Sequence, residues 1–228
     1  MPNASIAGDS HSGPAGRPLW IRTTIGFLGR RGVLAAISGN LLEWYDFTAY
    51  GFLAPTLAGL FFPSSDPTAA LLASFATLAV GYAARPLGSV VFGHVGDRFG
   101  RKPAMVFSVA LMAAGSLALA LLPTYAMAGI VAPILLVLVR IVQGVAIAGE
   151  YTTSGVLLVE EAAPRHRFFV GSWIPFAMAW GCVLGSGVPA AVAGALDGEA
   201  MAAWGWRVPF ALGAGVGFVS LWMRLSLA

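Results

Sequence analysis

The stretch that decides the fold is GHVGDRFGRK, residues 93–102, which lies between two long apolar runs. It is punctuated by glycine and carries Asp97, Arg98, Arg101 and Lys102, whereas charged residues make up only 10% of the chain. Ordinary soluble domains are about a quarter charged. With 58% apolar residues among 228, the chain has more apolar surface than a soluble fold could hide from water. The composition therefore predicts an all-α integral membrane protein, in which residues 93–102 form a loop between two membrane-spanning helices.

Six apolar runs are each long enough to cross about 30 Å of hydrocarbon as a helix. The breaks between them contain turn-forming residues, as at Pro63–Pro67 and Pro123–Tyr125. The expected helices cover residues 33–62, 69–92, 104–122, 128–159, 168–196 and 204–225. Residues 1–32 are rich in Ser, Gly and Pro and are expected to form a disordered basic tail. The folded unit is therefore expected over residues 33–228.

The basic residues gather in the tail and in every second loop. They are Arg17, Arg22, Arg30, Arg31, Arg98, Arg101, Lys102, Arg165 and Arg167. The loops between them carry acidic residues instead, namely Asp66, Asp197 and Glu199. Because basic loops stay on the cytoplasmic side, both termini are expected to be cytoplasmic in a multi-pass protein of the cell (inner) membrane. The net charge of +3 thus reflects topology, and no nucleic-acid partner is expected.

Five ionisable residues fall inside the expected helices. They are Glu43, Asp46, Arg85, Arg140 and Glu150. Such a residue is costly in hydrocarbon unless it is paired or faces water, so each is a candidate for a functional site. A single buried arginine–carboxylate pair can be purely structural, but apolar residues would pack a bundle as well or better. A water-accessible polar path through the bundle explains the whole set.

Helical spacing places these charges on two inward faces. The stripe on the first helix comprises Asn40, Glu43, Asp46 and Tyr50. The stripe on the fourth helix comprises Arg140, Gln143 and Glu150. At about 1.5 Å per residue, Glu43 and Arg140 fall at similar depths from opposite ends of their helices. They are therefore expected either to pair or to form two walls of one site.

The residue types indicate transport rather than catalysis. The guanidinium of Arg140 is a planar fork that suits a carboxylate. A carboxyl group that loses its water shell holds its proton more tightly, so Glu43, Asp46 or Glu150 could carry a proton. No nucleophile–base pair is discernible in the sequence, and the chain is not expected to be an enzyme.

Two further features of the sequence bear on ligand binding. Trp173, Phe176 and Trp180 could form a cation–π wall for a quaternary amine, although an aromatic stripe at this spacing is also typical of packing. Cys182 is the single cysteine and His94 lies apart from other ligand types. Neither a metal site nor a cofactor is therefore expected.

Several short motifs resemble those of the major facilitator superfamily. GHVGDRFGRK (93–102) resembles its loop between the second and third helices, and RIVQG (140–144) its fourth-helix motif. The metabolite:proton symporter family is more specifically resembled by GNLLEWYDFTAYG (39–51), RPLG (85–88), GEY (149–151), GSW (171–173) and WGWRVPF (204–210). That family includes proline/betaine, 2-oxoglutarate, citrate and shikimate permeases.

The resemblance covers residues 32–225 and implies the N-terminal half of a twelve-helix symporter, built as a three-plus-three inverted repeat. It implies alternating access, the proton as coupling ion, and a small carboxylate or zwitterion as substrate. The implied partners are the bilayer and a missing C-terminal six-helix half. The implied substrate and proton pathway comprises Asn40, Glu43, Asp46, Tyr50, Arg85, Arg140, Gln143 and Glu150. The implied cytoplasmic gate comprises Gly93, Asp97, Arg98, Gly100, Arg101, Lys102 and Glu160.

Two alternatives remain open at this point. The chain could be a non-transporting remnant or assembly subunit whose motifs only maintain the fold. It could also be a six-helix protein that transports by pairing two copies. The sequence leaves open the substrate, the proton stoichiometry and the acid that carries the proton.

Overall fold

The computed structural model describes residues 31–160 and 164–226, with all their side chains except those of residues 31–36, 101–102, 149–160 and 166. The described chain is helical and contains no strand. The helices are α2 (Arg31–Phe61), α3 (Pro67–Ala83), α4 (Arg85–Phe99), α5 (Arg101–Leu121), α6 (Tyr125–Ala128), α7 (Val131–Glu160), α8 (Arg167–Gly171), α9 (Trp173–Ala195), α10 (Gly198–Ala200) and α11 (Arg207–Leu225). A 3-10 turn (Pro164–His166) precedes α8 and a π-helical segment (Met201–Gly205) precedes α11.

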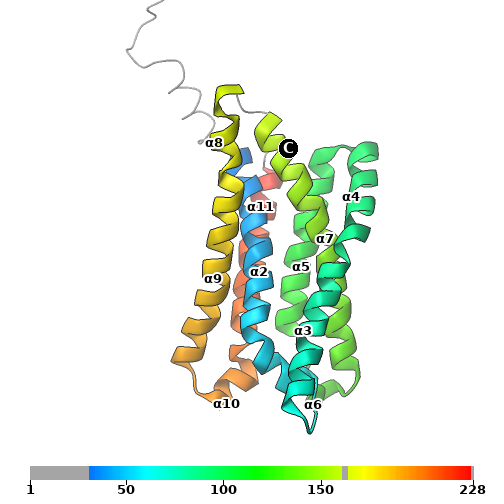
Figure 1. The fold of residues 1–228 in the computed structure, drawn as a ribbon, viewed down its shortest axis with the longest axis vertical. Helices are drawn as coiled ribbons and strands as arrows, with labels where there is room; N and C mark the ends of the chain where they lie inside the picture. The colour runs from blue at the N-terminus through cyan, green and yellow to red at the C-terminus, as the bar shows by residue number, and fades with distance from the viewer. Residues whose placement is uncertain (1–30, 161–163, 227–228) are drawn as a thin grey trace, which may run out of the picture.

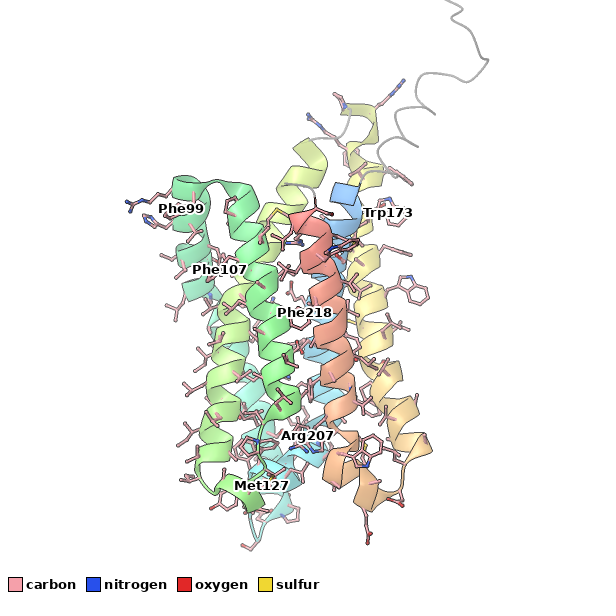
Figure 2. The ribbon with its side chains drawn as sticks, turned by 180° about the vertical axis from the view of Figure 1, so that it is seen from behind. Phe99, Phe107, Met127, Trp173, Arg207 and Phe218 are labelled. Atoms are coloured by element: carbon pink, nitrogen blue, oxygen red, sulfur yellow. The ribbon has the colours of Figure 1, made fainter. Side chains whose placement is uncertain are left out.

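The long helices lie side by side and run alternately up and down the bundle (Figure 1). The α4–α5 junction lies at one end with the ends of α7 and α11, and α6 and α10 lie at the other. Large apolar side chains such as Phe107 and Phe218, which are 55% and 47% exposed, cover the outside (Figure 2). This surface suits hydrocarbon rather than water.

Among the described residues, five helical stretches are long and apolar enough to cross a membrane. They are Pro67–Phe99, Pro103–Leu121, Val131–Ala148, Arg167–Ala195 and Gly198–Leu225. The helix α2 is not among them, although it has 31 residues. Polar residues of its stripe interrupt its apolar sequence, and the bundle buries Asn40, Glu43 and Asp46 in its interior. The expected all-α membrane fold is therefore confirmed, and α2 carries the buried polar stripe.

The expected loop at residues 93–102 is wrong. Residues up to Phe99 continue α4, and α5 begins at Arg101, so Gly100 alone joins the two helices. Its φ of 94° and ψ of 158° lie in a region open essentially only to glycine. Gly93 lies within α4 and has open space around it. The glycine and charge content suggested a loop, but one positive-φ residue suffices to reverse the chain.

Other helix bounds differ from the expected ones in smaller ways. The second expected helix, 69–92, is divided between α3 and α4 at Ala84, two residues before Pro86, whose ring and missing N–H disrupt a helix. The sixth begins at Arg207 rather than Trp204, after the π-helical segment. Of the expected disordered tail, residues 1–30 lie outside the described residues, and positions 31 and 32 begin α2.

The largest buried apolar cluster joins the second half of α2 to α5, α7 and α11. It includes Tyr50 and Phe61 of α2, which pack near Leu136, Trp206 and Phe210. The Phe61 and Trp206 rings meet edge to face with centroids 5.5 Å apart. This cluster packs α2 against its neighbours. It extends along α2 as far as Tyr50, which lies one turn from the polar residues of the stripe.

Candidate functional site

Asp46 and Arg140 form an ion pair in the centre of the bundle. Arg140 Nη1 on α7 donates to Asp46 Oδ2 on α2 at 2.6 Å. The two residues are only 1% and 4% exposed. The Arg140 guanidinium also lies 4.0 Å from the ring centroid of Tyr50, one turn along α2 from Asp46. Burial takes both charges out of water, and hydrogen bonds to their other polar atoms offset part of that cost.

Two neighbours supply that additional satisfaction to Asp46. Ser116 Oγ on α5 donates to Asp46 Oδ1 at 2.8 Å. Gln143 Nε2 on α7 donates to Asp46 Oδ2 at 3.2 Å and lies 3.3 Å from Ser116 Oγ. Three side chains thus direct donors at one carboxylate, so both of its oxygens are hydrogen-bonded inside the bundle.

A second ion pair joins Glu43 to Arg85. Arg85 Nη2 lies 2.9 Å from Glu43 Oε1, and the two side chains are 21% and 2% exposed. Arg85 also lies over the ring of Tyr82, 4.0 Å from its centroid. It is the first residue of α4, at the break that precedes Pro86. The second pair is therefore nearer the surface and attached to a discontinuous part of the backbone.

The expected pairing of Glu43 with Arg140 is wrong, because each residue has another partner. Depth along a helix can be counted from the sequence, but the rotation of one helix against its neighbour cannot. Asp46 was among the expected site residues, but Ser116 of the third expected helix, which donates to it, was missed. The alternative expectation was that Glu43 and Arg140 form two walls of one site. It depends on which residues line the pocket.

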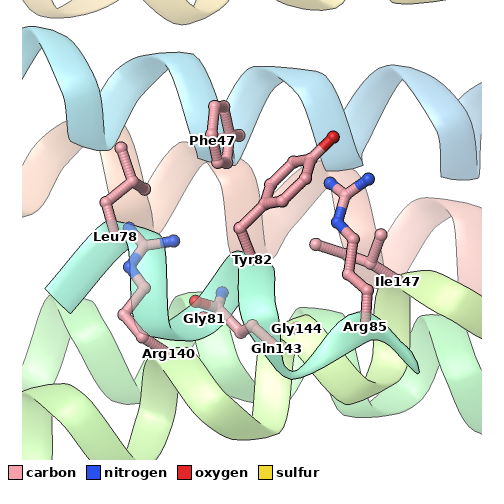
Figure 3. Close-up of a pocket in the computed structure, with 9 residues that line it drawn as sticks. All are labelled: Phe47, Leu78, Gly81, Tyr82, Arg85, Arg140, Gln143, Gly144 and Ile147. Carbon is pink, nitrogen blue, oxygen red and sulfur yellow. The ribbon is translucent and has the colours of Figure 1, made fainter. Parts of the chain in front are cut away.

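Arg85 and Arg140 line one small pocket between α2, α3, α4 and α7. Its lining residues are Phe47, Leu78, Gly81, Tyr82, Arg85, Arg140, Gln143, Gly144 and Ile147. Figure 3 shows the two guanidinium groups at opposite ends, with Tyr82 and Gln143 between them. Its volume of about 20 Å³ holds about one water molecule. Two guanidinium groups around such a space form a site for an anion, carboxylate above all.

Some polar atoms of the pocket have no hydrogen-bond partner among the described residues. These are Arg85 Nε, Arg140 Nε, Arg140 Nη2 and Gln143 Oε1. Buried polar atoms are normally satisfied by protein or by water. The pocket therefore has three donors and one acceptor that a ligand or water can use.

Close contact between α3 and α7 brings the two arginines together. A Cβ on Gly81 would lie 2.9 Å from the carbonyl oxygen of Arg140, and a Cβ on Gly144 would overlap the carbonyl of Gly81. Small residues let membrane helices approach in this way. Any larger side chain at either position would push α3, which ends beside Arg85, away from α7, which carries Arg140.

A larger apolar hollow adjoins the pocket on the outer face of α3. It has a volume of about 480 Å³ and is lined by Phe47, Phe75, Leu78, Ala79, Tyr82 and Ala83. Phe47, Leu78 and Tyr82 belong to both cavities. The Phe47 and Tyr82 rings are 5.6 Å apart, tilted at 60°. The volume of the hollow falls within the size range of small-molecule sites. The three shared residues separate it from the charged pocket.

The remaining first-helix residues of the expected pathway have packing contacts. Asn40 Nδ2 donates to the carbonyl of Ile174 at 2.9 Å, which joins α2 to α9. Tyr50 Oη donates to the carbonyl of Ser74 at 3.2 Å, which joins α2 to α3. Neither residue lines the pocket. The side chain of Glu150 lies outside the described residues.

The expected gate residues lie at the α4–α5 end, away from the pocket. Asp97 and Arg98 are exposed there, near Phe99 in Figure 2. The Arg98 guanidinium is 5.8 Å from the ring centroid of Phe99. The side chains of Arg101, Lys102 and Glu160 lie outside the described residues, so their part in a cytoplasmic gate stays a prediction.

The aromatic stripe of α9 is a ladder of edge-to-face rings. Trp173 and Phe176 are 5.3 Å apart and Phe176 and Trp180 are 6.2 Å apart. Neither described cavity includes any of the three. The aromatic residues beside the charged pocket are Phe47 and Tyr82. Across the described ranges, no three His, Cys, Asp or Glu side chains come together as metal ligands would.

An all-helical membrane bundle with arginine–carboxylate pairs beside an interior pocket carries ionisable residues of the kind that mark substrate, ion or proton pathways. The family described as "Sugar (and other) transporter" matches residues 32–226. The chain belongs to this family.

Individual relatives are transporters as well. The chain is 40% identical over 198 residues to the glycine betaine/proline/ectoine/pipecolic acid transporter OusA of Dickeya dadantii, which is 87% of this chain and 40% of that protein. It is 40% identical over 195 residues to the alpha-ketoglutarate permease of Escherichia coli, covering 86% of this chain and 45% of the permease. These names support the expectation that the chain is not an enzyme.

The fold matches a solved transporter. The partially occluded inward-open structure of the xylose transporter XylE from E. coli gives a TM-score of 0.77 at 21% identity, covering 86% of this chain and 49% of XylE. XylE is a major facilitator superfamily protein, so the expected half of that fold is confirmed. The chain spans less than half the length of these relatives.

Proposed function

We propose that the chain is the N-terminal half of a proton-coupled symporter for a small carboxylate or zwitterion. The observation that carries this proposal is the pair of buried arginine–carboxylate contacts, Arg140–Asp46 and Arg85–Glu43, around one pocket. A charge inside a membrane bundle is costly, and such residues mark substrate and proton pathways. Cations that can bind an anion, next to acids that can bind a proton, are the components that symport requires.

The substrate class follows from the guanidinium groups and agrees with the relatives. Glycine betaine, proline and pipecolic acid, named for OusA, and alpha-ketoglutarate, named for the permease, differ in size and charge but all have a carboxylate. An arginine fork matches a carboxylate with two parallel hydrogen bonds. In a zwitterion, the positive end would meet the rings of Phe47 and Tyr82, which border the same pocket.

In this proposal the hollow beside α3 is completed by a second six-helix half. The charged pocket has room for about one water molecule, so it must widen to admit a metabolite. Rocking of one half against the other would open it alternately to each side. Both termini are cytoplasmic in this arrangement, and residues 93–102 act with Glu160 as a cytoplasmic gate.

Uptake by the full-length protein in proteoliposomes tests the proposal. Labelled 2-oxoglutarate, citrate, proline and glycine betaine would be offered with and without an inward proton gradient. Gradient-driven accumulation of one of them is expected, and no movement of any solute would make symport wrong. The 228-residue chain reconstituted alone is the matched comparison, because uptake by that chain would favour the homo-oligomeric alternative.

A further inference from the structure

The amide of Gln143 is held in one orientation by its partners on α2 and α5. Gln143 Nε2 donates to Asp46 Oδ2 at 3.2 Å and lies 3.3 Å from Ser116 Oγ. Asp46 also accepts from Arg140 and Ser116, so its oxygens act as acceptors here. The NH2 group of the amide, rather than its oxygen, must therefore face Asp46.

Packing against α5 also holds the Gln143 side chain in place. The residue is only 1% exposed. Gly115 of α5 leaves the space that the side chain occupies, because a Cβ on Gly115 would lie 2.5 Å from Gln143 Cγ and 3.2 Å from Nε2. A side chain that is packed along its length and hydrogen-bonded through Nε2 cannot rotate freely. The position of Oε1 is therefore set by the protein before any ligand binds.

The oxygen end of the same amide has no partner. Gln143 lines the charged pocket, and its Oε1 is buried without a hydrogen-bond partner among the described residues. The described lining contains two arginines and no carboxylate. Gln143 Oε1 is thus a buried acceptor in a site whose other unpartnered atoms, Arg85 Nε, Arg140 Nε and Arg140 Nη2, are donors. Buried acceptors are normally satisfied, so this oxygen suits a ligand that brings a donor.

Arg140 lies one turn before Gln143 on α7 and offers a complete carboxylate site. Its Nη1 donates to Asp46, whereas Nε and Nη2 have no partner among the described residues. Nε and Nη2 share one edge of the guanidinium, and such an edge binds a carboxylate through two parallel hydrogen bonds. Residues three apart on a helix have Cβ atoms about 5–6 Å apart. Both side chains extend from α7 in Figure 3, so a carboxylate on Arg140 would bring its neighbouring substituent close to Gln143.

Building on the proposed function, we propose that Gln143 determines specificity, because its Oε1 accepts a hydrogen bond from an N–H or O–H group next to the substrate carboxylate that Arg140 binds. The preferred substrates are carboxylates with a protonated amine or a hydroxyl beside the carboxylate. Fully methylated amines and keto acids have no such donor and would leave Oε1 unsatisfied. A site built to accept a hydrogen bond rejects analogues that lack the donor. Ser116 is a positioning residue, because it acts on the substrate only through the amide of Gln143.

Matched pairs of solutes test this assignment on the purified full-length protein. Binding is measured by titration calorimetry in detergent for proline against N,N-dimethylproline, and for 2-hydroxyglutarate against 2-oxoglutarate. Only the first member of each pair has a donor beside the carboxylate. Wild type should bind that member about 5- to 100-fold more tightly, the range expected when a buried acceptor loses its donor. N-methylproline controls for the bulk of the methyl groups, since it keeps one N–H and should bind more like proline.

Variants then separate specificity from packing. Gln143→Met keeps the length of the side chain without the amide, so it should bind both members of a pair with similar affinity. A purely structural role of Gln143 would weaken both members equally and leave their ratio unchanged. Ser116→Ala should reduce the ratio by less than Q143M does. Ser186→Ala is the matched control and should keep the wild-type ratio, because the Ser186 hydroxyl on α9 donates to carbonyls of its own helix.

The wild-type ratio needs no variant and covers the case in which Q143M does not fold. Equal binding within the pairs, tighter binding of the member without a donor, or no binding of either pair would overturn the role of Gln143. An unchanged ratio in folded Q143M would overturn it as well. Failure of symport is a separate result: a wild type with the expected preference that accumulates none of these solutes on a proton gradient would support the role of Gln143 and remove the proposed proton coupling.

Discussion

The guanidinium of Arg140 lies 4.0 Å from the ring centroid of Tyr50 while its Nη1 donates to Asp46 at 2.6 Å. Tyr50 and Asp46 are four residues apart on α2, so one face of that helix holds the arginine from two sides. Tyr50 is also part of the largest apolar cluster. The polar centre and the apolar core of the bundle thus share a residue, and disturbance of one is expected to reach the other.

We expect Arg140→Gln to destabilise the protein strongly. Removing one partner of a buried ion pair costs about 3–5 kcal/mol, because the other charge is left buried. The double variant D46N/R140Q leaves no such charge and should recover much of the loss in thermal unfolding measured in detergent. Arg98→Gln, at an exposed position, should change stability by no more than about 0.5 kcal/mol. Equal destabilisation by the single and double variants would contradict this account of the pair.

Gly144→Ala is expected to separate α3 from α7. Its Cβ would overlap the carbonyl of Gly81, and overpacking of a tight contact costs about 1–3 kcal/mol. The variant should unfold at a lower temperature and lose substrate affinity, since the contact holds Arg85 and Arg140 around one pocket. Gly187→Ala is the control, because nothing lies within 4 Å of a Cβ at that position of α9. If both variants behave like wild type, the close contact is not needed.

At the junction of α4 and α5, Gly100→Ala should be strained. The backbone there has φ 94° and ψ 158°, and a side chain in this region costs about 1–3 kcal/mol. We expect lower stability and faster proteolysis at the junction. Gly93→Ala, in open space within α4, should be neutral or stabilising by up to about 1 kcal/mol. Identical behaviour of the two variants would argue against the positive-φ junction.

Asp97→Asn tests the proposed gate in the full-length protein. Asp97 is exposed at the end of α4, so the change should leave folding and membrane insertion intact. If Asp97 contacts the second half, gradient-driven uptake should fall sharply, while Asp66→Asn at the opposite end should not affect it. Normal uptake by D97N would reduce residues 93–102 to an orientation signal.

Much of the fold could be predicted because apolar length and charge scarcity are local properties of the sequence. The same applies to the polar stripe of α2, whose members Glu43 and Asp46 are indeed buried. The choice of partners could not be predicted, since it depends on how α2 and α7 are rotated about their axes. That rotation is set by contacts such as Gly81 with Arg140, between residues distant in the sequence. The α4–α5 junction was missed because four charges and three glycines suggest a loop, whereas one glycine makes the turn.

The junction at Gly100 has a mechanical consequence for the site. A connector of one residue has only two free dihedral angles, so α4 and α5 are expected to tilt together as a lever. The helix α4 begins with Arg85, and α5 carries Ser116, which donates to Asp46. A movement that draws Arg85 away from Glu43 would therefore pull on the hydroxyl that holds Asp46, and the two ion pairs would respond in step.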